Sequence, residues 1–350
     1  MPRLPTALIL EIQFEERRMS TETEYLKLVQ HAAGDEGWAD DMNNNLAKID
    51  EISQNFQTNL VINGNFDIWQ RGTSFPSISH GVYTADRIQT GIVGATVNVD
   101  RKDNTDTEHP SPYMFTATVT ATTSDVVQFS QRIENYNAFK GKTLTFSVRL
   151  QLPDTTNKYQ IVLYDSVSGI TVNIPKSTNW QTVTGTYTIN SEASSIVLLL
   201  RFSPTDENIT SSEFNINYYT LNVGSTALPF NIRSYGEELA LCMRYYQKSY
   251  AQGTSPGTVT IGNCHPLYAN FNGTYVEPMR IQLNPTMRCP PTVVIYSPYS
   301  GSSGYVYDAS TLTDLAIWGT NSADNLLLPC FPVVEGRLYR VHYTADAELY

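Results

Sequence analysis

Tyrosine, serine and glycine are concentrated in one segment near the C-terminus, residues 296–308, and these residue types are suited to binding. Tyrosine presents a rigid apolar ring with a hydroxyl at its edge, while serine and glycine adapt to the shape of a partner. The segment predicts either a recognition loop or a hairpin whose alternating tyrosines cover one face of a sheet. A second loop, residues 263–275, is similarly composed. The candidate ligand-binding residues are Tyr296, Tyr299, Tyr305, Tyr307, His265 and Tyr268.

The sequence gives little support for catalysis. Its five histidines have no local partner that would indicate a catalytic triad or a His-x-x-x-His metal pair. Its four cysteines contain no Cys-x-x-Cys motif, so free thiols are expected, with a disulfide between Cys264 and Cys289 as the alternative. A glycosidase needs only two carboxylates that the fold brings together, so a missing motif does not exclude one. We expect a protein that is not an enzyme and has no cofactor.

The charge of the chain limits its partners. The formal net charge is −11, and residues 1–58 alone carry eleven acids and five bases. Neutralisation of phosphates by Lys and Arg dominates affinity for nucleic acids, so DNA and RNA are not expected partners. The sequence has no apolar stretch as long as a membrane helix requires, so membrane insertion is not expected either.

Helical spacing dominates residues 1–58. Thr21 and Glu24 have the spacing of a capping box, which predicts a short helix that ends near Gly34. A second helix carries a heptad-like apolar stripe that is too short for an isolated coiled coil. It predicts either a bundle of several chains, which we favour, or a helix packed on its own β-domain. The stripe residues assigned to oligomerisation are Trp38, Met42, Leu46, Ile49 and Phe56.

From residue 59 onward the spacing of apolar residues changes to two. Leu144, Phe146, Val148 and Leu150 alternate with polar residues, which predicts a strand with one buried face. Turn residues separate further segments of this kind. The predicted strands cover residues 114–119, 126–133, 144–150, 159–164, 182–189, 196–202 and 214–221. So many short strands without intervening helices indicate an antiparallel sandwich.

A short helix is predicted after this sandwich. Ser234 and Glu237 have the spacing of a capping box, so the helix should begin near Tyr235. An apolar face follows at steps of three and four residues. The residues on this face are Leu239, Cys242, Met243, Tyr246 and Tyr250. Strand-like segments then return and predict a smaller β-domain. They cover residues 258–261, 275–283, 292–296, 305–307, 312–318 and 338–343.

Two blocks of sequence carry a resemblance to a known family. The first is NGNFDIWQRG at residues 63–72 with YTADR at 83–87, and the second is STALPFNIRSYGEELALCMRYY at 225–246. Both resemble a junction found in tail-fibre and receptor-binding proteins of tailed bacteriophages. The resemblance implies a virion fibre protein with a central jelly roll. The predicted fold is mainly β, with an N-terminal helical stem (1–58), an antiparallel jelly-roll β-sandwich (59–233), a linker helix (234–252) and a smaller C-terminal β-sandwich (253–350).

The first block is also similar to the first strand of carbohydrate-binding jelly rolls, in which calcium can bind between the first and last strands. The resemblance implies Asp67 as the candidate ligand. The predicted closing strand, however, has Asn215 and Asn217 where acids are expected, and this departure favours an ordinary carboxylate at a strand end and no metal. Trp69 lies in the same block and is expected to pack as scaffold.

Together these observations predict a tail fibre that recognises a host-surface glycan as a homotrimer, because several weak sites acting together raise avidity. The N-terminal helices would attach it to other tail or capsid proteins, and the C-terminal β-domain (253–350) would be the tip that contacts the host receptor. This arrangement places the protein on the surface of the phage particle. Two alternatives stay open. One is a purely structural head fibre or capsid decoration protein, and the other is a tail-spike enzyme that degrades polysaccharide.

Overall fold

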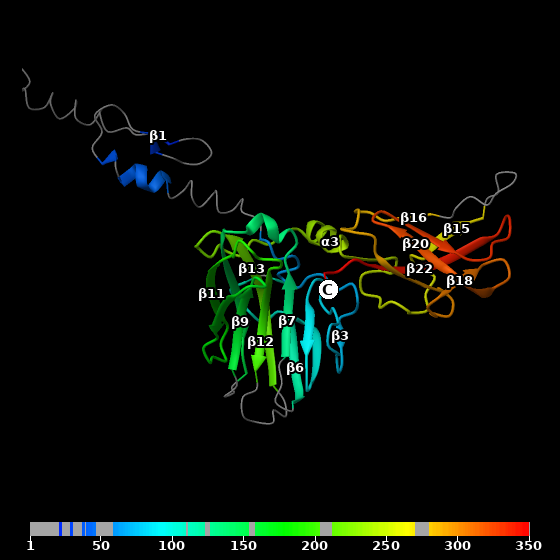
Figure 1. Cartoon of the computed structure of the whole chain (residues 1–350), viewed down its shortest axis with the longest axis horizontal. Helices are drawn as coiled ribbons and strands as arrows, with labels where there is room; N and C mark the ends of the chain where they lie inside the picture. The colour runs from blue at the N-terminus through cyan, green and yellow to red at the C-terminus, as the bar shows by residue number, and fades with distance from the viewer. Residues whose placement is uncertain are drawn as a thin grey trace, which may run out of the picture. The chain divides into compact units, whose positions relative to one another are not determined.

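The computed structural model describes residues 21–22, 29–30, 37–38, 40–46, 59–109, 111–122, 127–153, 158–203, 212–269 and 280–349. The chain divides into two compact units, residues 1–58 and residues 59–350. Figure 1 shows that the second unit is built mainly from strands. Within the described ranges, no helix is both long enough and apolar enough to cross a membrane.

The first unit differs from the prediction at its start. Strand β1 (Thr21–Glu22) pairs antiparallel with β2 (Val29–Gln30), where a helix was predicted. β-branched residues such as Thr21 and Val29 favour extended backbone, and here this preference outweighs the capping-box spacing. Residues 38 and 40–46 are helical, as predicted for the second segment. Trp38, Met42 and Leu46 lie at four-residue steps there, while Ile49 and Phe56 lie outside the described residues.

The second unit begins with a sandwich of two antiparallel sheets, as the period of two predicts. The five-stranded sheet has the order β10 (Gly169–Asn173), β9 (Lys158–Tyr164), β12 (Val197–Ser203), β7 (Val127–Arg132) and β4 (Gln89–Ile92). The six-stranded sheet has the order β11 (Gln181–Thr188), β8 (Thr143–Gln151), β13 (Ser212–Val223), β6 (Tyr113–Thr122), β5 (Ala95–Asp103) and β3 (Ser74–Phe75). A 3₁₀ turn, η1 (Tyr136–Phe139), links β7 to β8 across the two sheets.

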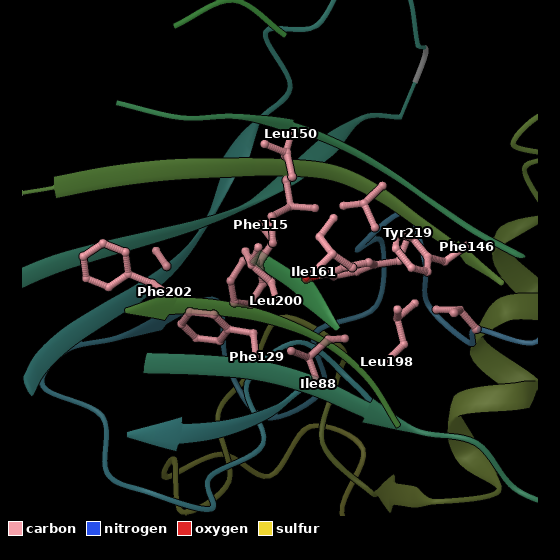
Figure 2. Close-up of a cluster of buried hydrophobic side chains, with 14 of the residues drawn as sticks. Ile88, Phe115, Phe129, Phe146, Leu150, Ile161, Leu198, Leu200, Phe202 and Tyr219 are labelled. Carbon is pink, nitrogen blue, oxygen red and sulfur yellow. The ribbon is translucent and has the colours of Figure 1, made fainter. Parts of the chain in front are cut away.

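Apolar side chains from both sheets fill the space between them. Figure 2 shows Phe129, Leu200 and Phe202 of the five-stranded sheet close to Phe115 and Leu150 of the six-stranded sheet. Each of these side chains is almost completely buried. Because successive strand residues point to opposite faces, the alternation that buries them turns the intervening residues outward. The candidate surface described below consists of such residues.

The opening segment lies along the closing strand of the sandwich, but residues 59–67 form no strand themselves, unlike the first strand of the jelly rolls they resemble. The backbone N–H of Leu60 donates to the carbonyl of Leu221 (2.8 Å), and Tyr219 N–H donates to the carbonyl of Gly64 (2.7 Å). A Cβ at Gly64 would lie 2.4 Å from the carbonyl oxygen of Tyr219, so only glycine fits this close approach. Trp69 is buried and stacks on Phe115, which confirms its role as scaffold.

Helix α3 (Tyr235–Met243) confirms the predicted capping box, in which the Ser234 hydroxyl accepts from Glu237 N–H and the Glu237 carboxylate accepts from Ser234 N–H. The predicted extension of the linker helix to residue 252 is wrong. Tyr246 begins β14 (Tyr246–Lys248), which pairs with the C-terminal strand, so neither Tyr246 nor Tyr250 lies on the helix. Aromatic residues fit a sheet at least as well as a helix, and the partner strand lies about a hundred residues away in sequence.

The C-terminal body is organised around one long strand, β22 (Leu338–Asp346). Strands β14 and β15 (His265–Tyr268) pair along one edge of β22, and β17 (Thr292–Tyr296) and β18 (Tyr305–Asp308) pair along the other. β19 (Thr313–Ala316) extends the sheet beyond β18. A second sheet has the order β16 (Ile281–Gln282), β21 (Leu326–Cys330) and β20 (Gly319–Ala323), and a separate hydrophobic core lies within this body.

Several details of this body differ from the sequence analysis. Residues 258–261 form no strand, and Thr260 N–H instead donates to the carbonyl of Pro298 (3.1 Å). The segment predicted at 275–283 is a strand only at β16 among its described residues. All four cysteines are free, so the alternative disulfide between Cys264 and Cys289 is not formed.

Candidate functional site

The two blocks that resemble phage fibre proteins meet at the joint between the sandwich and the C-terminal body. The Gln70 side-chain amide donates both to Asp86 Oδ2 (2.6 Å) and to the carbonyl of Tyr246 in β14 (2.7 Å). Asn63 N–H donates to Glu238 Oε1 of α3 (2.5 Å). These residues are buried and their polar groups bond to one another, so the motif residues connect the two β-bodies and do not present a binding surface.

Buried charges complete this joint, which involves residues near the C-terminal end of the chain. The Arg87 guanidinium donates to Glu348, and both side chains are almost fully buried. Arg71 bridges Asp346 and Glu348 at 3.2 Å each, and its guanidinium lies 3.7 Å from the centre of the Tyr246 ring. An uncompensated charge here would be unfavourable, so the pairs fix how the strands of the joint meet.

The outward-pointing residues of the five-stranded sheet form a largely polar surface, which we call the five-strand face. Figure 1 shows three of its strands, β9, β12 and β7, lying side by side. Amide side chains on the face both donate and accept hydrogen bonds, as sugar hydroxyls require, and Tyr164 exposes 41% of its surface as a flat platform. The face consists of Gln89, Gln128, Ser130, Arg132, Gln160, Val162, Tyr164, Thr171, Asn173, Val197, Leu199 and Arg201.

The strand register arranges these residues in rows across the sheet. One row is entirely polar and contains Asn173, Gln160, Arg201 and Gln128, with Gln160 Nε2 donating to Asn173 Oδ1 at 2.9 Å. Strands lie about 4.8 Å apart, so this row extends roughly 14 Å across the face. The adjacent row is apolar at Val162, which is partly exposed, and at Leu199, which is buried. Alternating polar and apolar rows suit a sugar ring, which has hydroxyls at its rim and apolar patches on its faces.

A third row runs from Tyr164 through Val197 to Arg132, and at Arg132 the face borders a cavity of about 110 Å³. The Tyr245 hydroxyl donates to Glu134 Oε2 (2.5 Å) inside this cavity, and burial raises the pKa of Tyr245, which keeps the phenol protonated. Arg244 lies 3.4 Å from the same carboxylate. The cavity is lined by Leu60, Ile62, Arg87, Gln131, Arg132, Ile133, Glu134, Phe139, Arg244 and Tyr245.

The structure brings most of the predicted tyrosines onto the outer face of the C-terminal sheet. Tyr268, Tyr307 and Tyr296 pair with Leu338, Arg340 and His342, which alternate with the core residues of β22. Tyr305 lies two residues from Tyr307 and shares its face. Tyr299 stacks on Tyr307 at 5.1 Å and is 61% exposed, whereas Tyr307 itself is buried. The segment is therefore a loop with a stacked aromatic pair at the edge of a sheet.

His265 is separated from these tyrosines. It pairs with Val341, so it lies on the core side of the sheet, and burial lowers its pKa. Tyr268 is 62% exposed and remains available for contact. Tyr296 packs against Tyr250, which stacks on His342 at 3.9 Å, so the centre of this face is covered by the chain itself. Of the predicted binding residues, Tyr268, Tyr299 and Tyr305 are the exposed ones.

Asp67 offers few further ligands for a cation. Its Oδ2 accepts from Asn65 Nδ2 (2.5 Å), and the buried Oδ1 has no hydrogen-bond partner among the described residues. Burial raises the pKa of Asp67 to about 6, opposed by the Asn65 hydrogen bond. The described part of the chain contains no group of three His, Cys, Asp or Glu side chains placed to hold a metal. The donor set is therefore one carboxylate and one amide, too few for calcium without backbone or water oxygens.

None of the residues predicted to bind a ligand lies on the five-strand face. One pattern in the sequence does indicate this face: in β7, the polar residues Gln128, Ser130 and Arg132 occupy every second position of a strand whose other residues are buried. An arginine that alternates with core residues, as Arg201 does between Leu200 and Phe202, is a similar signal. Neither pattern shows that the two strands are neighbours, which is a property of the sheet order alone.

No protein-family model matches the chain, and no curated protein matches it. Among solved structures, the chain is similar to the enzymatically active domain of tailspike protein 4 of bacteriophage CBA120, with 14% identity and a TM-score of 0.31 over 43% of this chain and 21% of that one. This chain therefore spans about a fifth of that tailspike structure. It is also similar to TmCBM61 in complex with β-1,4-galactotriose, with 12% identity and a TM-score of 0.32 over 48% of this chain and 99% of that one. A third similar structure is the CBM22-1 xylan-binding domain of Paenibacillus barcinonensis Xyn10C, with 12% identity and a TM-score of 0.32 over 49% of this chain and 97% of that one.

Proposed function

We propose that this chain is a tail fibre of a tailed bacteriophage that binds a glycan on the host surface through the five-strand face. The observation that carries the binding role is the face itself, where a 14 Å row of amide and guanidinium groups lies beside an apolar row and the exposed ring of Tyr164. The phage assignment is supported by the two sequence blocks that form the joint. In this role the protein is a virion component and acts by binding rather than by catalysis.

The proposal includes assembly as a homotrimer. Trp38, Met42 and Leu46 expose 57%, 51% and 54% of their surfaces at four-residue steps of one helix. Large apolar side chains in such a stripe gain stability when other copies of the helix cover them. Three joined chains would present three copies of the face and raise avidity through effective concentration. In the same proposal, residues 1–58 attach the fibre to other tail or capsid proteins.

The exposed tyrosines of the C-terminal body are a second surface that could contact the host. Tyr299 lies in the loop before β18 and Tyr305 is the first residue of that strand, and the two side chains are 61% and 40% exposed. Protein contacts commonly use such rings, because tyrosine provides contact area at a small loss of side-chain entropy. This surface lacks the polar rows of the five-strand face, so we assign it a secondary role.

An array of bacterial surface glycans, probed with the full chain, tests the proposal. Tyr164→Ala should weaken binding at least tenfold, because the exposed ring is lost while the core beneath it is unchanged. Thr184→Ala, an exposed change on the opposite sheet, is the matched control and should bind as the wild type does. If the two variants lose glycan affinity equally, the assignment of glycan binding to the five-strand face is contradicted.

Two further outcomes separate the rival functions. If Tyr299→Ala abolishes binding while Tyr164→Ala does not, recognition belongs to the C-terminal body. If the full chain binds no glycan on the array, the structural role in a head fibre or decoration protein is favoured. Reducing ends released from a bound polysaccharide would instead identify an enzyme.

A further inference from the structure

We propose that the glycan bound by the five-strand face is acidic, with a carboxylate or phosphate group held by Arg132 at the cavity and a second one held by Arg201 along the polar row. This inference rests on the proposed function and names the class of its ligand. It follows from two guanidinium groups that the described part of the chain leaves without an anion.

The two arginines differ from the other arginines of the sandwich. Arg149 is paired with Asp106 at 2.7 Å, and Arg101 stacks on the ring of Tyr113 at 4.1 Å. For Arg132 and Arg201, by contrast, no ion pair or ring contact is found within the described residues, and the Nε of each is buried without a hydrogen-bond partner. An anion that pairs with the outer nitrogens of each guanidinium group would compensate its charge.

The charge of the face contrasts with that of the whole chain. The net charge is −11, yet none of the residues that make up the five-strand face is Asp or Glu. A neutral polysaccharide requires no such exclusion of acids. Guanidinium groups bind carboxylates and phosphates through two parallel hydrogen bonds, and no carboxylate among the residues of the face itself competes for the two arginines.

The cavity beside Arg132 strengthens the case for an anion. Three arginines line it, Arg87, Arg132 and Arg244, against the single carboxylate of Glu134. Glu134 is already bonded to Tyr245 and Arg244, and Arg87 is neutralised by Glu348. Among the residues that the structure describes, none of the carboxylates at this cavity therefore compensates the positive charge of Arg132.

The spacing of the two arginines indicates that they bind different units of one chain. Arg132 is opposite Val197 on β12, and Arg201 lies four residues further along that strand. At about 3.3 Å per residue along the strand and 4.8 Å between strands, their Cα atoms are roughly 14 Å apart. One sugar unit cannot bridge this distance, so the predicted ligand is a polymer with repeated acidic groups.

The test measures binding of the full chain to polygalacturonate, to its fully methyl-esterified form and to poly(glycerol phosphate). The first two probes share one sugar backbone, and the ester caps each carboxylate with a methyl group and removes its charge. The third probe carries phosphate on a different backbone. We expect binding to one of the two acidic polymers at least tenfold tighter than to the methyl ester, and weakening as salt rises. The preferred acidic polymer identifies which anion the arginines hold.

Variants locate the anion. Arg132→Gln and Arg201→Gln should each weaken binding of the acidic polymer at least tenfold, while Arg101→Gln, which removes the same charge from the opposite sheet, should leave it unchanged. Arg132→Lys keeps the charge but loses the two-pronged geometry, so it should fall between wild type and Arg132→Gln. Unchanged thermal melting of these variants shows that folding is intact, and the lysine variant still reports if the glutamine variant fails to fold.

Two results would overturn the inference in distinguishable ways. Equal binding of the methyl ester and the acid, with no effect of the arginine variants, would mean that the face binds neutral glycan, so the proposed function would stand and the acidic class would fall. If none of the three polymers nor any array glycan is bound, the proposed function fails together with the inference.

Discussion

Removing the buried carboxylate of Glu348 should destabilise the joint between the sandwich and the C-terminal body. Its side chain is fully buried and is the carboxylate partner of Arg87, which is itself 1% exposed. Glu348→Gln keeps the shape but removes the charge. Arg71 retains Asp346 at 3.2 Å, so Arg87 is the group left uncompensated.

The size of the effect follows from burial. Removing one partner of a buried ion pair costs about 3–5 kcal/mol, since the other charge remains without compensation in a medium of low polarity. An exposed pair of comparable geometry is worth about 1 kcal/mol or less. The chain contains such a pair in Lys102 and Glu213, which are 2.8 Å apart with side chains 42% and 43% exposed. We expect Glu348→Gln to lower the free energy of unfolding by about 3 kcal/mol and Glu213→Gln by less than about 1 kcal/mol.

Urea unfolding followed by tryptophan fluorescence measures both variants. Trp69 is buried in the sandwich core, so its emission reports the unfolding of the sandwich. The double variant Arg87→Met with Glu348→Leu should recover most of the lost stability, because no unpaired charge remains. If Glu348→Gln and Glu213→Gln lose equal stability, the reasoning about the buried joint is wrong.

Three smaller predictions concern single groups. Ser234→Ala removes the cap of α3 and should lower the free energy of unfolding, measured in urea, by about 1 kcal/mol. Ser234→Asp should lower it by only about a few tenths of a kcal/mol. Equal losses of stability in the two variants would exclude the capping role. Asp67 binds its proton more tightly in the folded protein, because burial raises its pKa from 3.8 to about 6. The free energy of unfolding of the wild type should therefore fall as the pH rises from about 4 to 6 and stay lower above that. Asp67→Asn should remove this decline, a gain of about 1 kcal/mol at pH 7 after allowance for its partial exposure, and an unchanged pH profile would refute the assignment. A chelator should leave the melting temperature unchanged, and a fall that is absent in Asp67→Asn would show that this carboxylate binds a cation.

Local patterns predicted much of the second unit. The strand of Leu144, Phe146, Val148 and Leu150 is where the alternation places it, because a sheet with one buried face requires apolar residues at every second position. The start of α3 is also as predicted, since a cap acts within one turn of the chain. Both features depend on residues only a few positions apart.

Features that depend on distant partners were missed or misassigned. Tyr246 continues the apolar spacing of a helix, but pairing with Asp346 places it in a sheet. His265 and Tyr268 are three residues apart in one loop, and the register of β15 against β22 sends them to opposite faces. A shift of one residue in register exchanges the two faces, and no local pattern fixes that register.

The sequence by itself determined where most strands of the sandwich and helix α3 lie and which residues fill the cores, because these are set by neighbouring residues. Only the tertiary structure decided what the two blocks that resemble phage fibre proteins do and where the candidate site lies. It buried the motif residues in a joint, and it set Arg132 beside the Tyr164–Val197 row and Arg201 beside Gln128 and Gln160. Strand order brings together residues far apart in the chain, so a binding surface of this kind becomes visible only after the sheet is assembled.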